Sequence, residues 1–255
     1  MSGAVAGTGT PWIAYHKPRP EARVRLYCFP HAGGGASIYR TWPGALPPQI
    51  EVLPVQLPGR EARIREPAFT GLPPLIANLL PALGRGLLGG PVAFFGHSMG
   101  ALIAYELARA LRGAGSPRPL HLFVSARRAP DLPARTEPIH ALPEPEFRQR
   151  LRELNGTPEA VLEHPELMEL VGPTLRADFT LIESYEPVSA PPLDCPITAF
   201  GGVDDRDVSE EEVASWRRFT TAGFQLRMLP GDHFFLGQAS GETVIREIAR
   251  ALLAA

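Results

Sequence analysis

Short apolar runs alternate along the chain with longer segments whose apolar residues recur at helical spacing. An apolar run bounded by Gly or Pro is typical of a buried strand, whereas recurrence every three or four residues is typical of a helix. The expected strands are Val24–Phe29, Val52–Leu57, Pro91–Phe95, Leu120–Ser125, Pro196–Phe200 and Phe224–Leu229. The expected helices are Leu72–Leu88, Ala101–Leu111, Thr243–Leu253 and a helix that begins at the capping box of Ser209 and Glu212 and continues to about Phe219. This alternation predicts an α/β fold with a mostly parallel sheet covered by helices on both faces.

The stretch from 131 to 190 interrupts the alternation. It contains no convincing strand, and Phe147, Leu151 and Leu154 share one helical face, as do Leu175, Phe179, Ile182 and Tyr185. We expect a single domain over residues 1–255 with a helical insertion at about 131–190. Such an insertion either only covers core or forms a lid over a site, and its size favours the lid.

Composition excludes several classes of protein. The 255 residues are 44% hydrophobic and 20% charged with a formal net charge of −2, which is typical of a globular domain and gives no basic footprint for nucleic acid or membrane. Residues 1–10 lack the pattern of a secretory signal, and no apolar run approaches the length of a membrane span. Cys28 and Cys195 adjoin apolar runs and are expected to be buried, reduced thiols. We expect a cytoplasmic protein.

The strongest chemical signal is Gly96-His97-Ser98-Met99-Gly100, which matches the Gly-x-Ser-x-Gly nucleophile elbow. An apolar strand precedes it and an amphipathic helix follows it. The small flanking residues allow a tight turn that exposes the Ser98 hydroxyl, and the helix N-terminus offers N–H groups to a developing anion. The alternative, a serine that only caps a helix, does not explain this context.

A serine hydroxyl needs a general base at neutral pH. His233 follows the last expected strand, whereas His97 is too close to Ser98 in the chain to be well placed. An orienting acid is expected in the turn after Phe200, where Asp204 and Asp205 compete and the spacing favours Asp205. The acid that is not used is expected to bond the loop backbone.

Backbone N–H groups are expected to stabilise the oxyanion. Met99, which follows the nucleophile, supplies one. The glycine-rich loop after Phe29 supplies the other, with Ala32 favoured and His31 as the alternative.

Two further patterns fail in their context. Gly84-Arg85-Gly86-Leu87-Leu88-Gly89 matches a dinucleotide fingerprint but precedes a strand instead of following one, and Asn155-Gly156-Thr157 matches a glycosylation sequon without a secretory signal. Metal-ligand and phosphate-loop spacings do not occur in the sequence. We therefore expect neither a cofactor nor a metal.

Five motifs in order resemble those of type II thioesterases, the stand-alone editing enzymes of polyketide and non-ribosomal peptide synthesis in antibiotic biosynthesis. They are Phe29-Pro-His-Ala-Gly-Gly, Pro58-Gly59-Arg60-Glu61, Gly96-His-Ser-Met-Gly-Ala, the Gly201-Gly202 acid turn and Gly231-Asp-His-Phe-Phe. The resemblance runs from about Trp12 to the C-terminus and implies an α/β-hydrolase fold with a helical lid. It implies the triad Ser98, Asp205 and His233, with Ala32 and Met99 as oxyanion donors.

The resemblance also implies a substrate and a partner. The substrate is an acyl thioester on the phosphopantetheine arm of an acyl or peptidyl carrier protein, and we expect a monomer that binds no nucleic acid and no membrane. Carriers are generally acidic in such families, so the arginines at 60, 63 and 65, or those at 127 and 128, are docking candidates, with solvated surface arginines as the alternative. The competing hypotheses are an esterase or lipase, a cyclising thioesterase domain and a non-catalytic ligand-binding homologue.

Overall fold

A parallel sheet forms the centre of the molecule. The computed structural model describes residues 10–115, 117–133, 135 and 137–254. The expectation that no signal peptide is present concerns residues 1–10, and all of these except residue 10 lie outside the described part. Within this part, six strands pair side by side in the order β2-β1-β3-β4-β5-β6, and every pair is parallel. The strands are β1 (Val24–Phe29), β2 (Ile50–Pro54), β3 (Val92–His97), β4 (Leu122–Ser125), β5 (Ile197–Gly202) and β6 (Phe224–Leu229).

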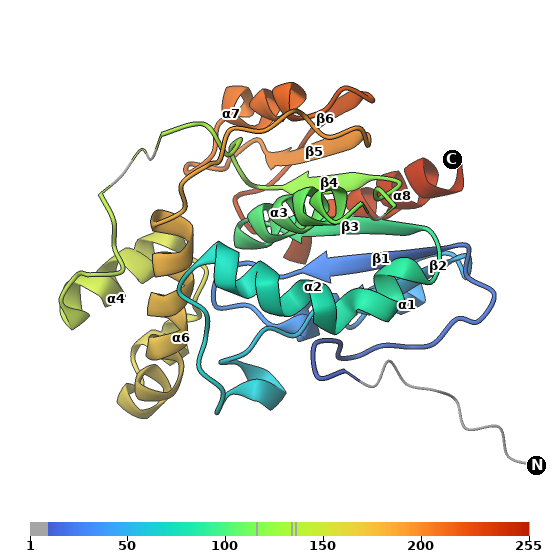
Figure 1. Cartoon of the computed structure of the whole chain (residues 1–255). Coiled ribbons are helices and arrows are strands. Elements are labelled where there is room, and N and C mark those ends of the chain that lie inside the picture. The colour runs from blue at the N-terminus through green and yellow to red at the C-terminus, as the bar shows by residue number, and fades with distance from the viewer. Residues whose placement is uncertain (1–9, 116, 134, 136, 255) are drawn as a thin grey trace, which may run out of the picture.

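Helices cover both faces of this sheet (Figure 1). Helices α2 (Leu72–Leu88) and α3 (Met99–Gly113) pack on one face, together with the short helix α7 (Glu210–Ala214) and the 3₁₀ turn that follows it. Helices α1 (Trp42–Ala45) and α8 (Ser240–Leu253) pack on the other face. The predicted α/β architecture with a parallel sheet is confirmed, and the capping box of Ser209 and Glu212 does open α7.

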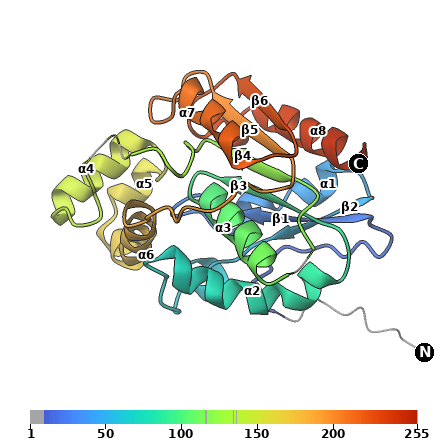
Figure 2. The same ribbon diagram turned by 45° about the horizontal axis from the view of Figure 1, so that its top comes forward.

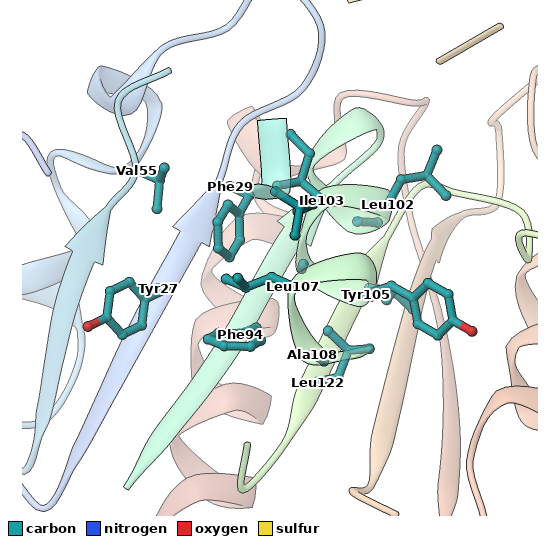
Figure 3. Close-up of a cluster of buried hydrophobic side chains, with 14 of the residues drawn as sticks. Tyr27, Phe29, Val55, Phe94, Leu102, Ile103, Tyr105, Leu107, Ala108 and Leu122 are labelled. Carbon is teal, nitrogen blue, oxygen red and sulfur yellow. The ribbon is translucent and has the colours of Figure 1, made fainter. Parts of the chain in front are cut away.

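Successive residues of a strand point to opposite faces, so each strand contributes to two cores. Tyr27 and Phe29 of β1 and Phe94 of β3 lie on the face of the sheet that α2 and α3 cover, and they belong to one buried cluster with Ile103 and Leu107 (Figure 3). The intervening strand residues Leu26, Cys28 and Phe95 pack in the second cluster against α1 and α8. Burial on both faces explains why these strands read as continuous apolar runs.

The insertion predicted between β4 and β5 is helical. It comprises α4 (Glu144–Leu154), α5 (Glu159–Leu162) and α6 (Pro165–Glu183), which carry a small buried cluster of their own. Both views place these helices beyond the end of the sheet toward which the strand arrows point (Figure 1 and Figure 2). We call α4, α5 and α6 the insertion helices.

Three strands differ by one or two residues from their expected bounds, and the strand after residue 49 differs most. The sequence predicts Val52–Leu57, whereas β2 spans Ile50–Pro54. β2 lies at the edge of the sheet, and its polar residue Glu51 bonds His16 and Arg25 instead of breaking the strand. Among the described residues, the helices are all too short or too polar to cross a membrane.

Candidate active site

Ser98 lies on a strained turn between β3 and α3. Its backbone has φ +53° and ψ −113°, a conformation that L-residues rarely adopt and that marks functional sites. The turn is held by two backbone hydrogen bonds, from Ser98 N to Ser125 O (2.8 Å) and from Ala101 N to Ser98 O (3.1 Å). The strand, the turn and the helix that the motif requires are therefore all present.

The glycines of the motif are sterically required. A Cβ on Gly96 would lie 2.1 Å from Gly100 O, and a Cβ on Gly100 would lie 2.1 Å from Phe29 O. Both contacts are with backbone atoms that cannot move aside. The elbow therefore packs directly against its own helix and against the end of β1.

A hydroxyl, an imidazole and a carboxylate form a hydrogen-bonded series at the turn. His233 Nε2 lies 3.1 Å from Ser98 Oγ, and His233 Nδ1 lies 2.8 Å from Asp205 Oδ2. The carboxylate requires a proton on Nδ1, which leaves Nε2 free to accept the serine proton. The structure thus brings the three residues expected from the sequence into one site.

Asp205 and Asp204 occupy different positions. The Asp205 side chain is 1% exposed, and its Oδ1 accepts the backbone N–H groups of Asp207 (2.8 Å) and Val208 (3.1 Å). Asp204 is exposed and its Oδ2 accepts Gly231 N at 3.4 Å, while its own N–H donates to Gly231 O. Asp205 faces the imidazole, and Asp204 ties the acid turn to the loop that carries His233.

Two further histidines, His31 and His97, lie near His233 and carry no charge at neutral pH. Burial, aided by the charges of His233 and Arg60, lowers the pKa of His31 to about 4. Burial and the charge of His233 lower the pKa of His97 well below its ordinary value, and its Nδ1 pairs with Ser125 Oγ at 2.9 Å. His97 faces Ser125 and does not compete for the Ser98 proton.

The expected oxyanion donors flank the serine turn in the fold. Met99 is the first residue of α3, and Ala32 lies in the loop after β1. In the described part of the chain, neither backbone N–H donates to a protein acceptor. Both groups are therefore available to a substrate oxygen, and their role stays a prediction.

Sequence reasoning missed Asp207, which approaches the same imidazole. One ligand-type atom of each of Asp205, Asp207 and His233 lies within 4.8 Å of the others. Burial and the charge of Asp205 raise the pKa of Asp207, whereas the charge of His233 opposes this rise. Both carboxylate oxygens of Asp205 already have partners, so the cluster is accounted for by the orientation of His233. The available sign in the sequence was that Asp207 lies only two positions after Asp205, in the same turn.

The insertion helices contact both loops of the site. A Cβ on Gly33 would lie 2.6 Å from Leu175 Cδ2 of α6, and a Cβ on Gly156, in the loop after α4, would lie 2.7 Å from Phe234. The insertion therefore packs against the loop of Ala32 and against the loop of His233. This packing is consistent with the predicted lid, whose role stays a prediction.

The first group of docking candidates is mostly buried, which corrects the sequence-based expectation. Arg60 is 5% exposed and pairs with Asp178, and Arg63 is 8% exposed and lies 4.4 Å from the centre of the Trp12 ring. Arg65 alone of this group is exposed. Asp178, the partner of Arg60, and Trp12, the ring beside Arg63, are distant in the chain, so local sequence does not indicate the burial of these arginines.

The second group of docking candidates is only partly accessible. Arg127 and Arg128 follow β4 and are half-buried. Burial, with the charge of Arg128, lowers the pKa of Arg127 to about 10. The Arg128 guanidinium lies 3.9 Å from Glu212.

The dinucleotide-like pattern lies inside a helix. Gly84 and Gly86 belong to α2, and Gly89 is its C-cap. A phosphate-binding fingerprint needs the turn between a strand and a helix, so its geometry is not formed here. Asn155 of the sequon adopts the left-handed conformation that ends α4.

The order of the site residues defines the class of protein. The nucleophile turn follows β3, the acid turn follows β5 and the histidine loop follows β6 in a parallel sheet, which is the arrangement of the α/β hydrolases. A thioesterase domain family matches residues 24–252. This match covers nearly the whole described chain.

Known relatives agree with this assignment. A Brevibacillus parabrevis protein described as linear gramicidin dehydrogenase LgrE is 49% identical over 228 residues, covering 88% of this chain and 86% of its own. The RedJ thioesterase of the prodiginine pathway of Streptomyces coelicolor has 42% identity and a TM-score of 0.85, covering 92% of this chain and 87% of its own. The type II thioesterase BorB of the borrelidin cluster has 38% identity and a TM-score of 0.85, covering 94% and 97%.

The chain belongs to the thioesterase domain family. The prediction of a type II thioesterase, a hydrolase that acts on thioesters, is confirmed by these similarities.

Proposed function

We propose that this enzyme hydrolyses aberrant or stalled acyl groups from the phosphopantetheine thiol of acyl or peptidyl carrier proteins in polyketide or non-ribosomal peptide synthesis. The observation that carries the proposal is the series Ser98–His233–Asp205, with separations of 3.1 and 2.8 Å. The names of two relatives, a thioesterase of the prodiginine biosynthetic pathway and a type II thioesterase of the borrelidin biosynthetic cluster, support the substrate class.

Acylation begins with attack of Ser98 Oγ on the thioester carbonyl carbon. The hydroxyl proton passes to His233 Nε2, and Asp205 stabilises the imidazolium through the Nδ1 proton. The N–H groups of Ala32 and Met99 donate hydrogen bonds to the carbonyl oxygen, where negative charge develops. Collapse of this intermediate breaks the carbon–sulfur bond, and the imidazolium proton goes to the departing thiol.

Deacylation repeats these roles with water. His233 Nε2 takes a proton from a water molecule that attacks the Ser98 ester, and the same two N–H groups hold the oxyanion. Collapse breaks the bond between the carbonyl carbon and Ser98 Oγ, and the proton returns to the serine. The acid leaves and the free hydroxyl is restored.

The insertion helices act as a lid over this site in our proposal. Their packing against Gly33 and Phe234 supports this role, because both residues adjoin the reacting groups in the chain. We further propose that the enzyme works as a monomer in the cytoplasm. The burial of both free thiols, Cys28 and Cys195, is compatible with a reducing compartment.

The test is a panel in which one acyl group is carried by a carrier protein, by N-acetylcysteamine and by ethanol as an oxygen ester. Hydrolysis of each is followed by chromatography of the released acid, at matched concentrations. We expect kcat/KM to be highest for the carrier thioester and lowest for the oxygen ester. An oxygen ester that reacts as fast as its matched thioester would identify an esterase instead.

A second measurement distinguishes an enzyme from a binding protein. A fluorophosphonate reacts only with an activated serine, so we expect mass spectrometry of the treated protein to locate the label on Ser98. An unlabelled Ser98 in folded protein would contradict the catalytic assignment.

A further inference from the structure

A buried carboxylate links the insertion to the loop of the expected oxyanion donor. Asp178 lies on α6, is 2% exposed, and occupies the apolar face that also carries Leu175 and Ile182. Its Oδ2 accepts the backbone N–H of Gly33 at 2.7 Å. Gly33 directly follows Ala32, so α6 holds the peptide unit next to the proposed donor.

Arg60 neutralises this carboxylate and holds the same loop from the other side. Its Nη1 and Nη2 donate to Asp178 Oδ2 and Oδ1, each at 2.7 Å, which is the paired geometry that suits a guanidinium and a carboxylate. Nη1 also donates to Gly34 O at 3.1 Å, and Nε donates to Pro58 O. The buried charges are therefore satisfied on all sides.

These bonds fix the orientation of four consecutive peptide planes, from the 31–32 unit to the 34–35 unit. Because a peptide unit is planar, holding its N–H or its C=O sets the direction of the other group. Asp178 holds the 32–33 unit through Gly33 N, and Arg60 holds the 34–35 unit through Gly34 O. Between them, Gly34 N donates to His31 O at 3.0 Å, and that carbonyl belongs to the same plane as the Ala32 N–H.

The loop has little freedom to adopt this shape without its partners. Gly33 has φ +74°, a left-handed conformation that favours glycine, and it packs under Leu175 of α6. Thr174, on the same part of α6, donates to Gly59 O in the segment that carries Arg60. The helix, the Arg60 segment and the loop are thus one connected unit.

We propose that Asp178 and Arg60 are positioning residues that aim the Ala32 N–H at the oxyanion, so that α6 is part of the catalytic apparatus and not only a cover. This inference rests on the proposed function. The pair touches neither the nucleophile nor the substrate carbonyl directly, so its loss weakens stabilisation of the transition state more than binding of the substrate. Loss of one oxyanion donor lowers kcat by about 10²- to 10³-fold in serine hydrolases.

The experiment replaces the pair while keeping its volume. The double variant R60M/D178L exchanges the buried ion pair for apolar side chains, a change that such sites often tolerate in stability. The nearly isosteric D178N retains one acceptor oxygen for the three N–H groups that Asp178 accepts, and it serves where the double variant does not fold. R176M is the matched control, since Arg176 also lies on α6 but bonds His140 O and Leu142 O within the insertion.

Three quantities are measured on folded proteins: kcat, KM for a small thioester, and the inhibition constant of an alkylboronic acid, which mimics the tetrahedral intermediate on Ser98. We expect kcat to fall by about 10²-fold in R60M/D178L and D178N and boronate binding to weaken in parallel, while KM changes by less than about threefold. R176M should keep its kcat and its boronate affinity.

Retention of kcat and boronate affinity in folded R60M/D178L or D178N would overturn the inference, as would an effect confined to KM. Failure of the proposed function would be seen in a different result, namely an inactive wild type or an active Ser98→Ala variant.

Discussion

Replacement of Asp205 by asparagine tests the charge of one carboxylate with almost no change in shape. In the native site, Oδ2 faces His233 Nδ1 and Oδ1 accepts two backbone N–H groups, from Asp207 and Val208. Asparagine has a single acceptor oxygen. If the oxygen faces His233, the amide NH₂ opposes two backbone donors in a site that is 1% exposed, and buried donors left unpaired cost about 1–3 kcal/mol each.

The asparagine amide is therefore more stable with its oxygen toward the two backbone N–H groups and its NH₂ toward His233, and an enzyme with this arrangement is inactive. The amide then donates to Nδ1, which moves the ring proton to Nε2, where it faces Ser98 Oγ and prevents His233 from accepting the serine proton. We expect kcat to fall by about 10⁴-fold, which corresponds to about 5 kcal/mol of transition-state stabilisation. The fold is kept, because both backbone bonds survive.

The assay is thiol release from an acyl-N-acetylcysteamine thioester, with unfolding midpoints measured in parallel. Asp204→Asn is the matched control: Asp204 is exposed, and an amide oxygen can still accept Gly231 N, so its activity should stay within about threefold of wild type. An Asp205→Asn variant that keeps more than a tenth of wild-type kcat would refute the reasoning, and so would a larger loss in Asp204→Asn.

Two further predictions concern stability. Gly100→Ala places a Cβ 2.1 Å from Phe29 O, so this variant should unfold at a markedly lower urea concentration than wild type and have little activity. Gly113→Ala is the control, because Gly113 lies in the same helix with open space around it; it should leave stability unchanged or raise it by up to about 1 kcal/mol. Equal unfolding midpoints for the two variants would contradict the packing of the elbow. Burial lowers the pKa of His121 to about 4, so its neutral form contributes stability fully above pH 6.5 and loses it as the pH falls toward 4. The free energy of unfolding of wild type should therefore drop between pH 7 and 4.5 by up to about 3 kcal/mol more than that of His121→Gln, and parallel pH profiles would argue against this burial.

The sheet could be predicted because its strands are buried on both faces. Val24–Phe29 and Phe224–Leu229 were predicted with the bounds that β1 and β6 have. The range predicted for β2 lies too far toward the C-terminus, because Glu51, at the sheet edge, has polar partners that lie elsewhere in the chain. A polar residue in an edge strand gives no local signal of pairing.

The site could be predicted as far as its residues are fixed by local turns. Ser98, His233 and the two acids lie directly after strands, and parallel strands end at one edge of a sheet. The choice between Asp204 and Asp205 depends on the exact path of one turn, which spacing suggests but only geometry gives.

The pattern of hydrophobic and polar residues does not predict ion pairs between residues that are distant in the chain. The sequence makes Arg60 a docking candidate because its partner, Asp178, is 118 positions away and gives no local signal. An acid inside the apolar stripe of a helix was the one available sign that a buried charge needed a partner. Such pairs are specified by tertiary packing, and neither residue alone indicates the other.

In the proposed mechanism, Ser98 attacks a carrier-bound thioester. The most direct measurement incubates an acylated carrier protein with wild type or with Ser98→Ala and follows the intact mass of the carrier over time. We expect wild type to return the carrier to its free-thiol mass, and the variant to do so at least about 10³-fold more slowly. Deacylation by folded Ser98→Ala at a rate near that of wild type would contradict the claim.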